Sequence, residues 1–402
     1  MRPVPALIYC LNVNKLYTFR QRLSRSVYED ATIVKLIFPY YLIFLCSYPP
    51  FSRTTLIRFI CLNVNKKGRF RLIQSPLLIT QRLISSFCFP ELTLYPMTFE
   101  EFLINRNPML LAMIRESWTN RKPLESSYHD LAMKQLYDYL LIGGMPEAVD
   151  VFLVTGDYRT ARTVIEELYN NYLSDMELYQ ASPESVMRSK AIFRHIYGEL
   201  NKENKNFRSS MVEEKAKTRD MKTPIDWLTT AHVVHQSWQL PEHVTSPLIR
   251  DNENAFRLYL LDIGMFTWQS GENASSFLLK QQQNTLSGIF FENYAANEFV
   301  AKGLPLYYWK GKSSAEMEFV VDSGNNIIPV DVKRGRSSLN SLVKFRNHNK
   351  NNLAVKLSGN QFGYSEEQKL LTVPLYQCFL LAEALKDGQL PPFPKPSLHC
   401  TL

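Results

Sequence analysis

The sequence predicts a multidomain α+β protein. Its 402 residues are enough for two or three domains of ordinary size. Hydrophobic residues make up 45% of the chain and charged residues 21%, which excludes a wholly disordered protein. Helical periodicity is typical of the middle of the chain, and alternating, strand-like runs are typical of the last third. We therefore expect four segments: 1–91, 92–186, 187–275 and 276–402.

The first segment, residues 1–91, is an atypical basic and hydrophobic leader. Residues 1–95 hold 13 lysines and arginines against 3 acidic residues, while the rest of the chain holds 33 against 35. The motif CLNVNK occurs twice, at Cys10–Lys15 and Cys61–Lys66, without the turns and steady periodicity of a solenoid. We expect this segment to be poorly structured. A genuine folded domain and a membrane segment stay open as alternatives.

The uncharged run Leu36–Ser52 is the longest apolar stretch of the chain. Three prolines interrupt it, and its length is at the lower limit for crossing a bilayer. No stable membrane association is therefore expected. The six cysteines are scattered and none forms a C-x-x-C pair, which predicts free thiols and a cytoplasmic location.

Residues 92–186 are predicted to be all-helical. Thr98-Phe-Glu-Glu101 is a capping box, which indicates the start of a helix. A second helix is expected over Ser127–Ile142, ended by Gly143-Gly144, because glycine is favoured just after a helix. Pro146 is suited to the first turn of the next helix, which stops at Gly156, and another helix begins near Asp157.

Residues 187–275 have the order of a winged-helix-like module. Helical pieces are followed by the alternating run His232–Leu240, and Asn201–Arg208 has the polar character expected at the entry to a second helix. One interpretation is that this module places a helix in the major groove of DNA. The other is that the helix only packs on its neighbours, since Val212–Lys217 has balanced charge.

The last segment, 276–402, is expected to be an α/β domain, a mixed sheet flanked by helices. Its predicted elements follow the order α-β-β-β-α-β. In chain order they are a helix over Asn284–Lys302, strands at Leu306–Trp309, Glu316–Val321 and Ile327–Lys333, a helix over Ser337–Asn347, and a strand at Leu353–Leu357.

The hairpin of this segment brings carboxylates together. If Gly324-Asn325 is a two-residue turn, residues whose numbers sum to 649 are paired, and Glu318 lies opposite Asp331 at about 5 Å between Cβ atoms. Strand alternation would place Met317, Phe319 and Val321 together on the other face. Facing carboxylates require a cation or a proton between them.

One or two carboxylates, together with waters and phosphate oxygens, suit Mg²⁺. On this interpretation Glu318, Asp331 and Glu292, from the preceding helix, bind the metal, and Lys333 holds a water or offsets the charge of a phosphate. The alternative is that these are solvent-facing charges on an edge hairpin, with Lys333 as their counter-ion. The spacing alone leaves both open.

At these residues the chain resembles a known family. Gly288–Asn293, Glu316–Phe319 and Ile328–Lys333 are similar to the C-terminal part of domain of unknown function 4143. Further similarity lies at Leu94–Phe102, Tyr139–Ala148, Trp227-Leu228 and Phe256–Gly264. That domain is found in prokaryotic AAA-type ATPases, and its C-terminal part resembles the PD-(D/E)XK restriction-endonuclease fold. The resemblance implies a nuclease-like motif at Glu292, Glu318, Asp331 and Lys333.

The chain departs from this family in two places. Glu318 stands where the family pattern usually has aspartate, which changes the metal cage. The phosphate-binding loop G-x-x-x-x-G-K-[ST] of the ATPase domain needs glycines, whereas Gly68 is the only glycine among the first 95 residues. The ATP-binding loop is therefore expected to be missing or degenerate.

These observations lead to two functional hypotheses. The first is a truncated or degenerate member of the AAA-type ATP-binding family that binds nucleic acid or protein and does not hydrolyse ATP on its own. The second is a Mg²⁺-dependent DNA nuclease of the PD-(D/E)XK type. Whether the chain is an enzyme stays open, and DNA and a protein are the partners considered.

Overall fold

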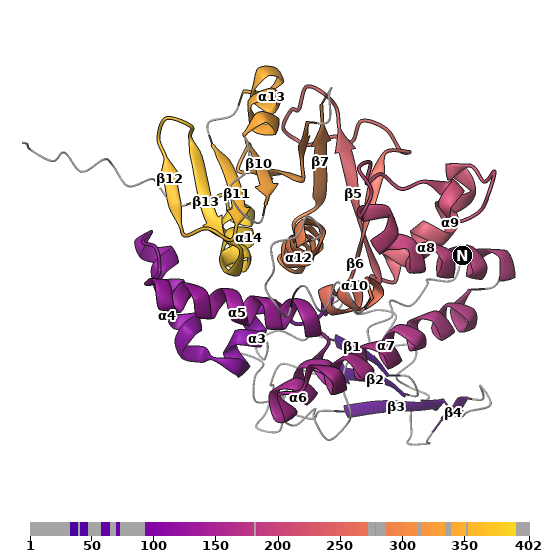
Figure 1. Ribbon diagram of the computed structural model, residues 1–402. Helices are drawn as coiled ribbons and strands as arrows, with labels where there is room; N and C mark the ends of the chain where they lie inside the picture. The colour runs from indigo at the N-terminus through magenta and orange to yellow at the C-terminus, as the bar shows by residue number, and fades with distance from the viewer. Residues whose placement is uncertain are drawn as a thin grey trace, which may run out of the picture. The chain divides into compact units, whose positions relative to one another are not determined.

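Figure 1 shows a computed structural model of the chain. The chain is divided into two units, residues 1–95 and 96–402. In the second unit the structure describes residues 96–180, 182–271, 278, 287–311, 315–333, 339–350 and 353–390. In the first unit it describes residues 93–95 and the backbone of 33–38, 41–46, 58–64 and 70–72.

The described strands of the first unit form one antiparallel sheet in the order β1-β2-β3-β4. They are β1 (Ile33–Phe38), β2 (Tyr41–Cys46), β3 (Arg58–Val64) and β4 (Phe70–Leu72). Part of the second CLNVNK copy lies in β3. The expected leader structure concerns mostly residues outside the described ones, and it stays a prediction. Among the described residues of the whole chain, no helix has the length and apolar character needed to cross a bilayer.

The second unit begins with helices, as predicted for residues 92–186. They are α3 (Phe99–Arg106), α4 (Pro108–Asn120), α5 (Ser126–Ile142), α6 (Pro146–Thr155) and α7 (Tyr158–Tyr179). The capping box is confirmed, because the Thr98 hydroxyl accepts from the Glu101 amide while the Glu101 carboxylate accepts from the Thr98 amide. Gly156 ends α6 in the left-handed conformation, and Asp157 caps α7.

The Gly143-Gly144 pair does more than end α5. The Gly144 amide donates to the Asp262 carboxylate at 2.7 Å, and the Met97 amide donates to the Gly144 carbonyl at 2.7 Å. A Cβ on Gly144 would lie 2.0 Å from the Met97 carbonyl oxygen, so only glycine fits there. The pair thus ties the helices to the start of α10 (Ile263–Gln269), whose N-cap is Asp262.

Helices and two strands follow, over the segment predicted to be winged-helix-like. They are α8 (Pro183–Leu200), two short 3-10 turns, η3 (Ser209–Met211) and η4 (Thr218–Met221), α9 (Lys222–Thr230), β5 (Val234–Leu240) and β6 (Phe256–Leu260). The predicted strand at 232–240 is confirmed as β5. However, β5 is hydrogen-bonded on both sides, to β6 and to β7, and is therefore an interior strand rather than part of a free two-stranded wing.

The C-terminal elements follow the predicted α-β-β-β-α-β order with one difference, because the predicted strand Glu316–Val321 is divided into β8 and β9. They are α12 (Ser287–Ala301), β7 (Leu306–Lys310), β8 (Glu316–Met317), β9 (Phe319–Ser323), β10 (Asn326–Val332), α13 (Asn340–His348) and β11 (Ala354–Ser358), then β12 (Gly363–Ser365), β13 (Leu370–Pro374), η5 (Leu375–Gln377) and α14 (Cys378–Lys386). Two mixed sheets result, ordered β6-β5-β7-β8 and β12-β13-β11-β10-β9.

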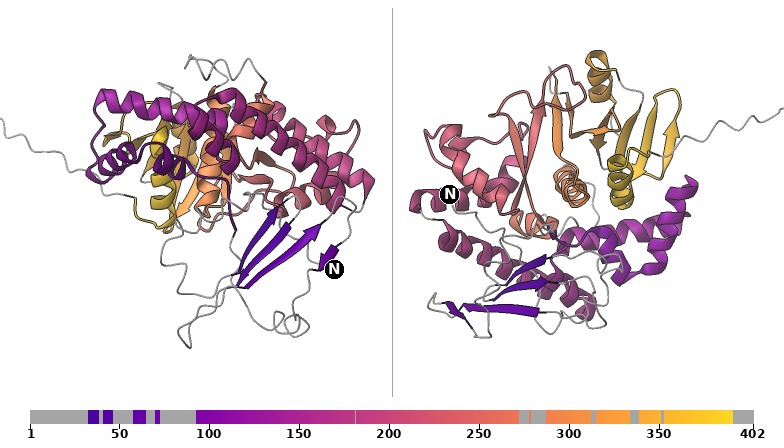
Figure 2. Two further views of the ribbon diagram at one scale, coloured as in Figure 1. Left: turned by 90° about the horizontal axis from the view of Figure 1, so that it is seen from below. Right: turned by 180° about the vertical axis from the view of Figure 1, so that it is seen from behind.

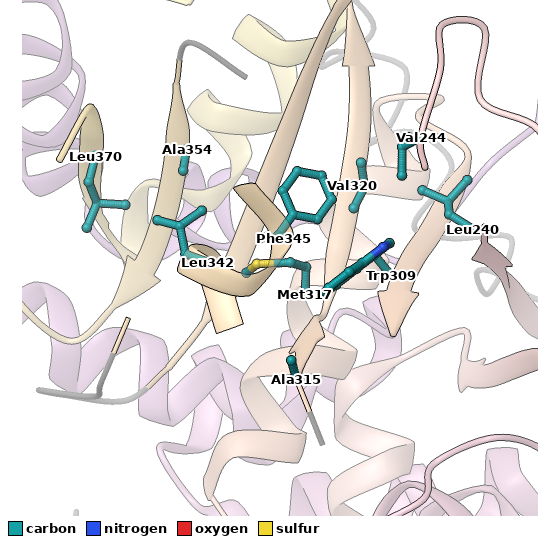
Figure 3. Close-up of a cluster of buried hydrophobic side chains, with 10 residues drawn as sticks. All are labelled: Leu240, Val244, Trp309, Ala315, Met317, Val320, Leu342, Phe345, Ala354 and Leu370. Carbon is teal, nitrogen blue, oxygen red and sulfur yellow. The ribbon is translucent and has the colours of Figure 1, made fainter. Parts of the chain in front are cut away.

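Helices cover both faces of these strands. On one side, α12 and α14 contact each other, and Phe299 of α12 meets Phe319 of β9 edge-on, with ring centroids 5.2 Å apart (Figures 1 and 2). On the other side, Phe345 of α13 packs on Trp309 of β7, with centroids 5.2 Å apart (Figure 3). The apolar cluster around Trp309 and Phe345 also contains Met317 and Val320.

Candidate functional site

The two sheets of the second unit diverge at Glu318. This residue alone separates β8, which pairs with β7, from β9, which pairs with β10. Met317 and Val320 lie in the same apolar cluster although they are three residues apart, whereas Phe319 contacts α12 (Figure 3). The prediction that Met317, Phe319 and Val321 share one face is therefore wrong, because the interruption at Glu318 breaks the alternation.

The register of the hairpin is as predicted. Phe319 pairs with Val330 and Val321 with Ile328, so paired numbers sum to 649. Glu318 is one position beyond the last pair, and its carboxyl group interacts with that of Asp331. Gly324 and Asn325 have φ values of 57° and 67°, as a type I′ turn requires. The turn chemistry thus fixed which carboxylates face each other.

Three of the four predicted site residues, Glu318, Asp331 and Lys333, come together at this fork, the point where the two sheets diverge. The Glu318 carboxylate accepts from Lys333 Nζ and, at 3.3 Å, from the Val332 amide. Lys333 Nζ also lies 3.0 Å from Asp331 Oδ1. Burial raises the pKa of Glu318 to about 7, even though the Lys333 ammonium opposes this shift. Burial acts to lower the pKa of Lys333, but the carboxylates of Glu318 and Asp331 outweigh it and hold this pKa above its ordinary value.

Glu292, the fourth predicted residue, has other partners. On α12 its carboxylate accepts from the Tyr259 hydroxyl at 2.7 Å, from Arg257 Nη1 at 3.3 Å and from Lys205 Nζ at 2.5 Å. The side chain of Glu292 is 2% exposed and that of Arg257 is fully buried. A buried carboxylate with three donors, two of them cationic, is a satisfied group.

The same two cations also hold Glu316. Arg257 Nη2 lies 2.7 Å and Lys205 Nζ 3.3 Å from its carboxylate. Burial acts to raise the pKa of Glu316, but Arg257 and Lys205 outweigh it and lower the pKa to about 2. Arg257 further lies over the ring of Tyr308, 3.9 Å from its centroid, a cation–π contact.

Lys205 reaches the site from a loop between α8 and η3. The Phe207 amide donates to the Phe256 carbonyl at 2.9 Å, and the Tyr308 hydroxyl donates to Asn206 Oδ1 at 2.8 Å. Both bonds are made just after Lys205 and fasten the loop to β6 and β7. The loop is thus part of the site, although Lys205 and Glu292 are 87 residues apart in the chain.

The charges of the site balance. Its four acids are Glu292, Glu316, Glu318 and Asp331, and its four bases are Lys205, Arg257, Lys333 and Lys356. Lys356 belongs to β11 and is paired in register with Asp331 of β10. Within the described ranges, no three His, Cys, Asp or Glu side chains lie close enough to hold one metal ion. The predicted trio Glu292, Glu318 and Asp331 therefore does not form a common cage, and the Mg²⁺ ligand roles stay predictions.

Sequence analysis missed Lys205, Arg257, Tyr259 and Glu316 as members of the site. Arg257 carried a usable signal: an arginine inside the apolar run FRLYLL must be buried, and a buried arginine needs a carboxylate. Lys205 carried none, because its loop is polar throughout.

In the comparison with known proteins, two parts of the chain match family descriptions. Residues 287–376 match the family described as Domain of unknown function (DUF4143), which confirms that part of the predicted resemblance. Residues 133–276 match Domain of unknown function (DUF8612), across the predicted boundary at residue 186. No curated protein and no solved structure matches the chain.

Proposed function

We propose that this chain binds nucleic acid on a nuclease-like framework without cleaving it. The proposal is supported by the resemblance of the C-terminal segment to the PD-(D/E)XK fold, in which the predicted third element is here divided into β8 and β9, and above all by one observation. Lys205 and Arg257 join the carboxylates of Glu292 and Glu316, where a catalytic metal would need free oxygens. We place the chain among relatives of prokaryotic AAA-type ATPases, as a member that does not hydrolyse ATP on its own.

Charge balance is the physical reason for expecting no cleavage. Four acids matched by four bases leave no net negative charge to attract a divalent ion. Mg²⁺ gives up its waters reluctantly and would have to displace a lysine from a buried carboxylate. That lysine would then lose its partner in a poorly hydrated place, which is costly.

The test uses the purified chain with labelled duplex DNA. We expect binding by fluorescence anisotropy that weakens steeply between about 50 and 200 mM salt, because phosphate contacts release counter-ions. We expect no product in Mg²⁺ or Mn²⁺ on a sequencing gel. Metal-dependent cleavage by the wild type would refute the proposal of a non-cleaving binder.

A metal-dependent nuclease is the second candidate, favoured by the meeting of Glu318, Asp331 and Lys333 at the fork. In such an enzyme the two carboxylates bind the ion and Lys333 assists the attacking water. Lys333→Ala and Asp331→Asn decide between the candidates. Products that appear with the wild type and vanish in both variants establish the nuclease, whereas products that persist point to a contaminant.

A further inference from the structure

An open depression lies between the Lys205 loop and the edge formed by β7 and β8. Its volume is about 520 Å³. The residues that line it are all polar or charged: Lys202, Glu203, Asn204, Arg208, Lys310 and Glu316. No aromatic or aliphatic residue is among them, so the lining offers charge and hydrogen bonds rather than an apolar surface.

The cations of this depression differ in how far they are neutralised. Lys202 Nζ is paired with Glu199 at 2.6 Å, and Glu316 is already held by Arg257 and Lys205. Lys310 Nζ instead contacts a neutral group, Asn204 Oδ1, at 3.1 Å. The amide positions this ammonium without cancelling its charge.

Arg208 is the second cation without a neutralising partner. Its side chain is exposed, while its backbone amide donates to Glu199 at 3.2 Å and so fixes the residue in place. Within the part of the chain that the structure describes, neither Arg208 nor Lys310 forms an ion pair, although Lys310 lies opposite Glu316, whose carboxylate Arg257 and Lys205 hold. Arg208 and Lys310 outnumber Glu203, the other acid of the lining, so the polar, open hollow favours an anion.

We infer that this depression binds phosphate groups of a nucleic-acid backbone through Arg208 and Lys310. The hollow is open, so a long chain can enter and leave it, and its polar lining suits phosphates rather than bases. Glu316 belongs both to the depression and to the buried charge cluster, so the bound backbone passes beside that cluster. This inference rests on the proposed function and names the surface that carries it.

The experiment compares duplex DNA binding by the wild type and by Arg208→Gln, Lys310→Gln and the double variant. Glutamine removes the charge and keeps a polar side chain. The control is Arg219→Gln, since Arg219 is 76% exposed and lies outside the depression. We expect the double variant to bind about tenfold or more weakly and its slope of log K against log salt to fall by about 2, while the control is unchanged.

The outcomes separate the two levels of the inference. If the wild type binds and the double variant matches it in affinity and slope, the depression is not the site, although the proposed function stands. If the wild type binds no duplex even at low salt, both fail. Arg208→Gln changes an exposed side chain and keeps the test decisive if Lys310→Gln does not fold.

Discussion

Replacing Lys205 by methionine tests whether charge compensation governs the buried cluster. The ammonium lies 2.5 Å from Glu292 and 3.3 Å from Glu316, and its side chain is 17% exposed. Removing one partner of a buried pair typically costs about 3–5 kcal/mol. Arg257 still holds both carboxylates, and water can reach Glu316 from the depression. We therefore expect the low end of that range, about 3 kcal/mol.

Urea unfolding followed by circular dichroism measures this loss. Lys202→Met is the matched control, because Lys202 sits in the same loop but its ion pair with Glu199 is more exposed and is expected to contribute about 0–1 kcal/mol. A Lys205→Met variant within about 0.5 kcal/mol of the wild type would show that Lys205 does not compensate the acids.

Divalent ions supply the second half of the test. Without Lys205, and at a pH above about 7 where Glu318 is ionised, the cluster carries one net negative charge, so Mn²⁺ has an uncompensated carboxylate to bind. A dissociation constant of about 1 mM would let 10 mM Mn²⁺ restore about 1.4 kcal/mol to the variant. We expect little effect on the wild type. If Mn²⁺ stabilises the wild type as much as the variant, the acids bind metal beside the amine and the argument from charge balance is wrong.

Three further changes test other parts of the structure. Gly144→Ala puts a Cβ 2.0 Å from a backbone oxygen and should lower the unfolding free energy by about 3 kcal/mol. Gly198→Ala is the control: it lies in an open position of α8 and should raise the unfolding free energy by about 0.5–1 kcal/mol. Glu298→Gln should remove a pH dependence of the unfolding free energy, because burial raises the pKa of Glu298 to about 8. Between pH 4.5, the ordinary pKa of a glutamate, and pH 8 the wild type should lose up to about 1.4 kcal/mol of stability per pH unit. An equally steep decline in the variant would contradict this. Asn325→Val should cost about 1–2 kcal/mol in urea unfolding, because φ at Asn325 is 67°; an unchanged midpoint would refute the turn assignment.

Local signals in the sequence predicted most elements of the second unit. The capping box at Thr98, the glycine pair after α5 and the turn at Gly324-Asn325 each depend on residues a few positions apart, and each is confirmed. The hairpin register followed from the turn, since a two-residue loop leaves a single pairing. Strand alternation failed at Glu318, because the passage of the chain from one sheet to the other has no local signature.

The charge partners could not be predicted in the same way. Lys205 and Glu292 are 87 residues apart, and Arg257 and Glu292 are 35 apart. The topology that makes β5 an interior strand brings β6, and with it Arg257, next to α12, which carries Glu292. Whether an acid is free for a metal therefore depends on the whole fold, whereas the acid motif itself depends only on one hairpin.

Glu316 and Glu318 show how partners from other parts of the fold change the chemistry of two neighbouring acids. Glu316 has a pKa lowered to about 2, and Glu318 one raised to about 7, although both are largely buried. Glu316 meets two cations from other elements, whereas Glu318 faces Asp331 and shares Lys333 with it. A ligand at Glu316 must displace two cations held by other elements, whereas one at Glu318 meets a single cation, Lys333, and a carboxyl group that takes up a proton near neutral pH. Any response of this cluster to protons or ions is therefore expected first at Glu318, the residue where the two sheets part.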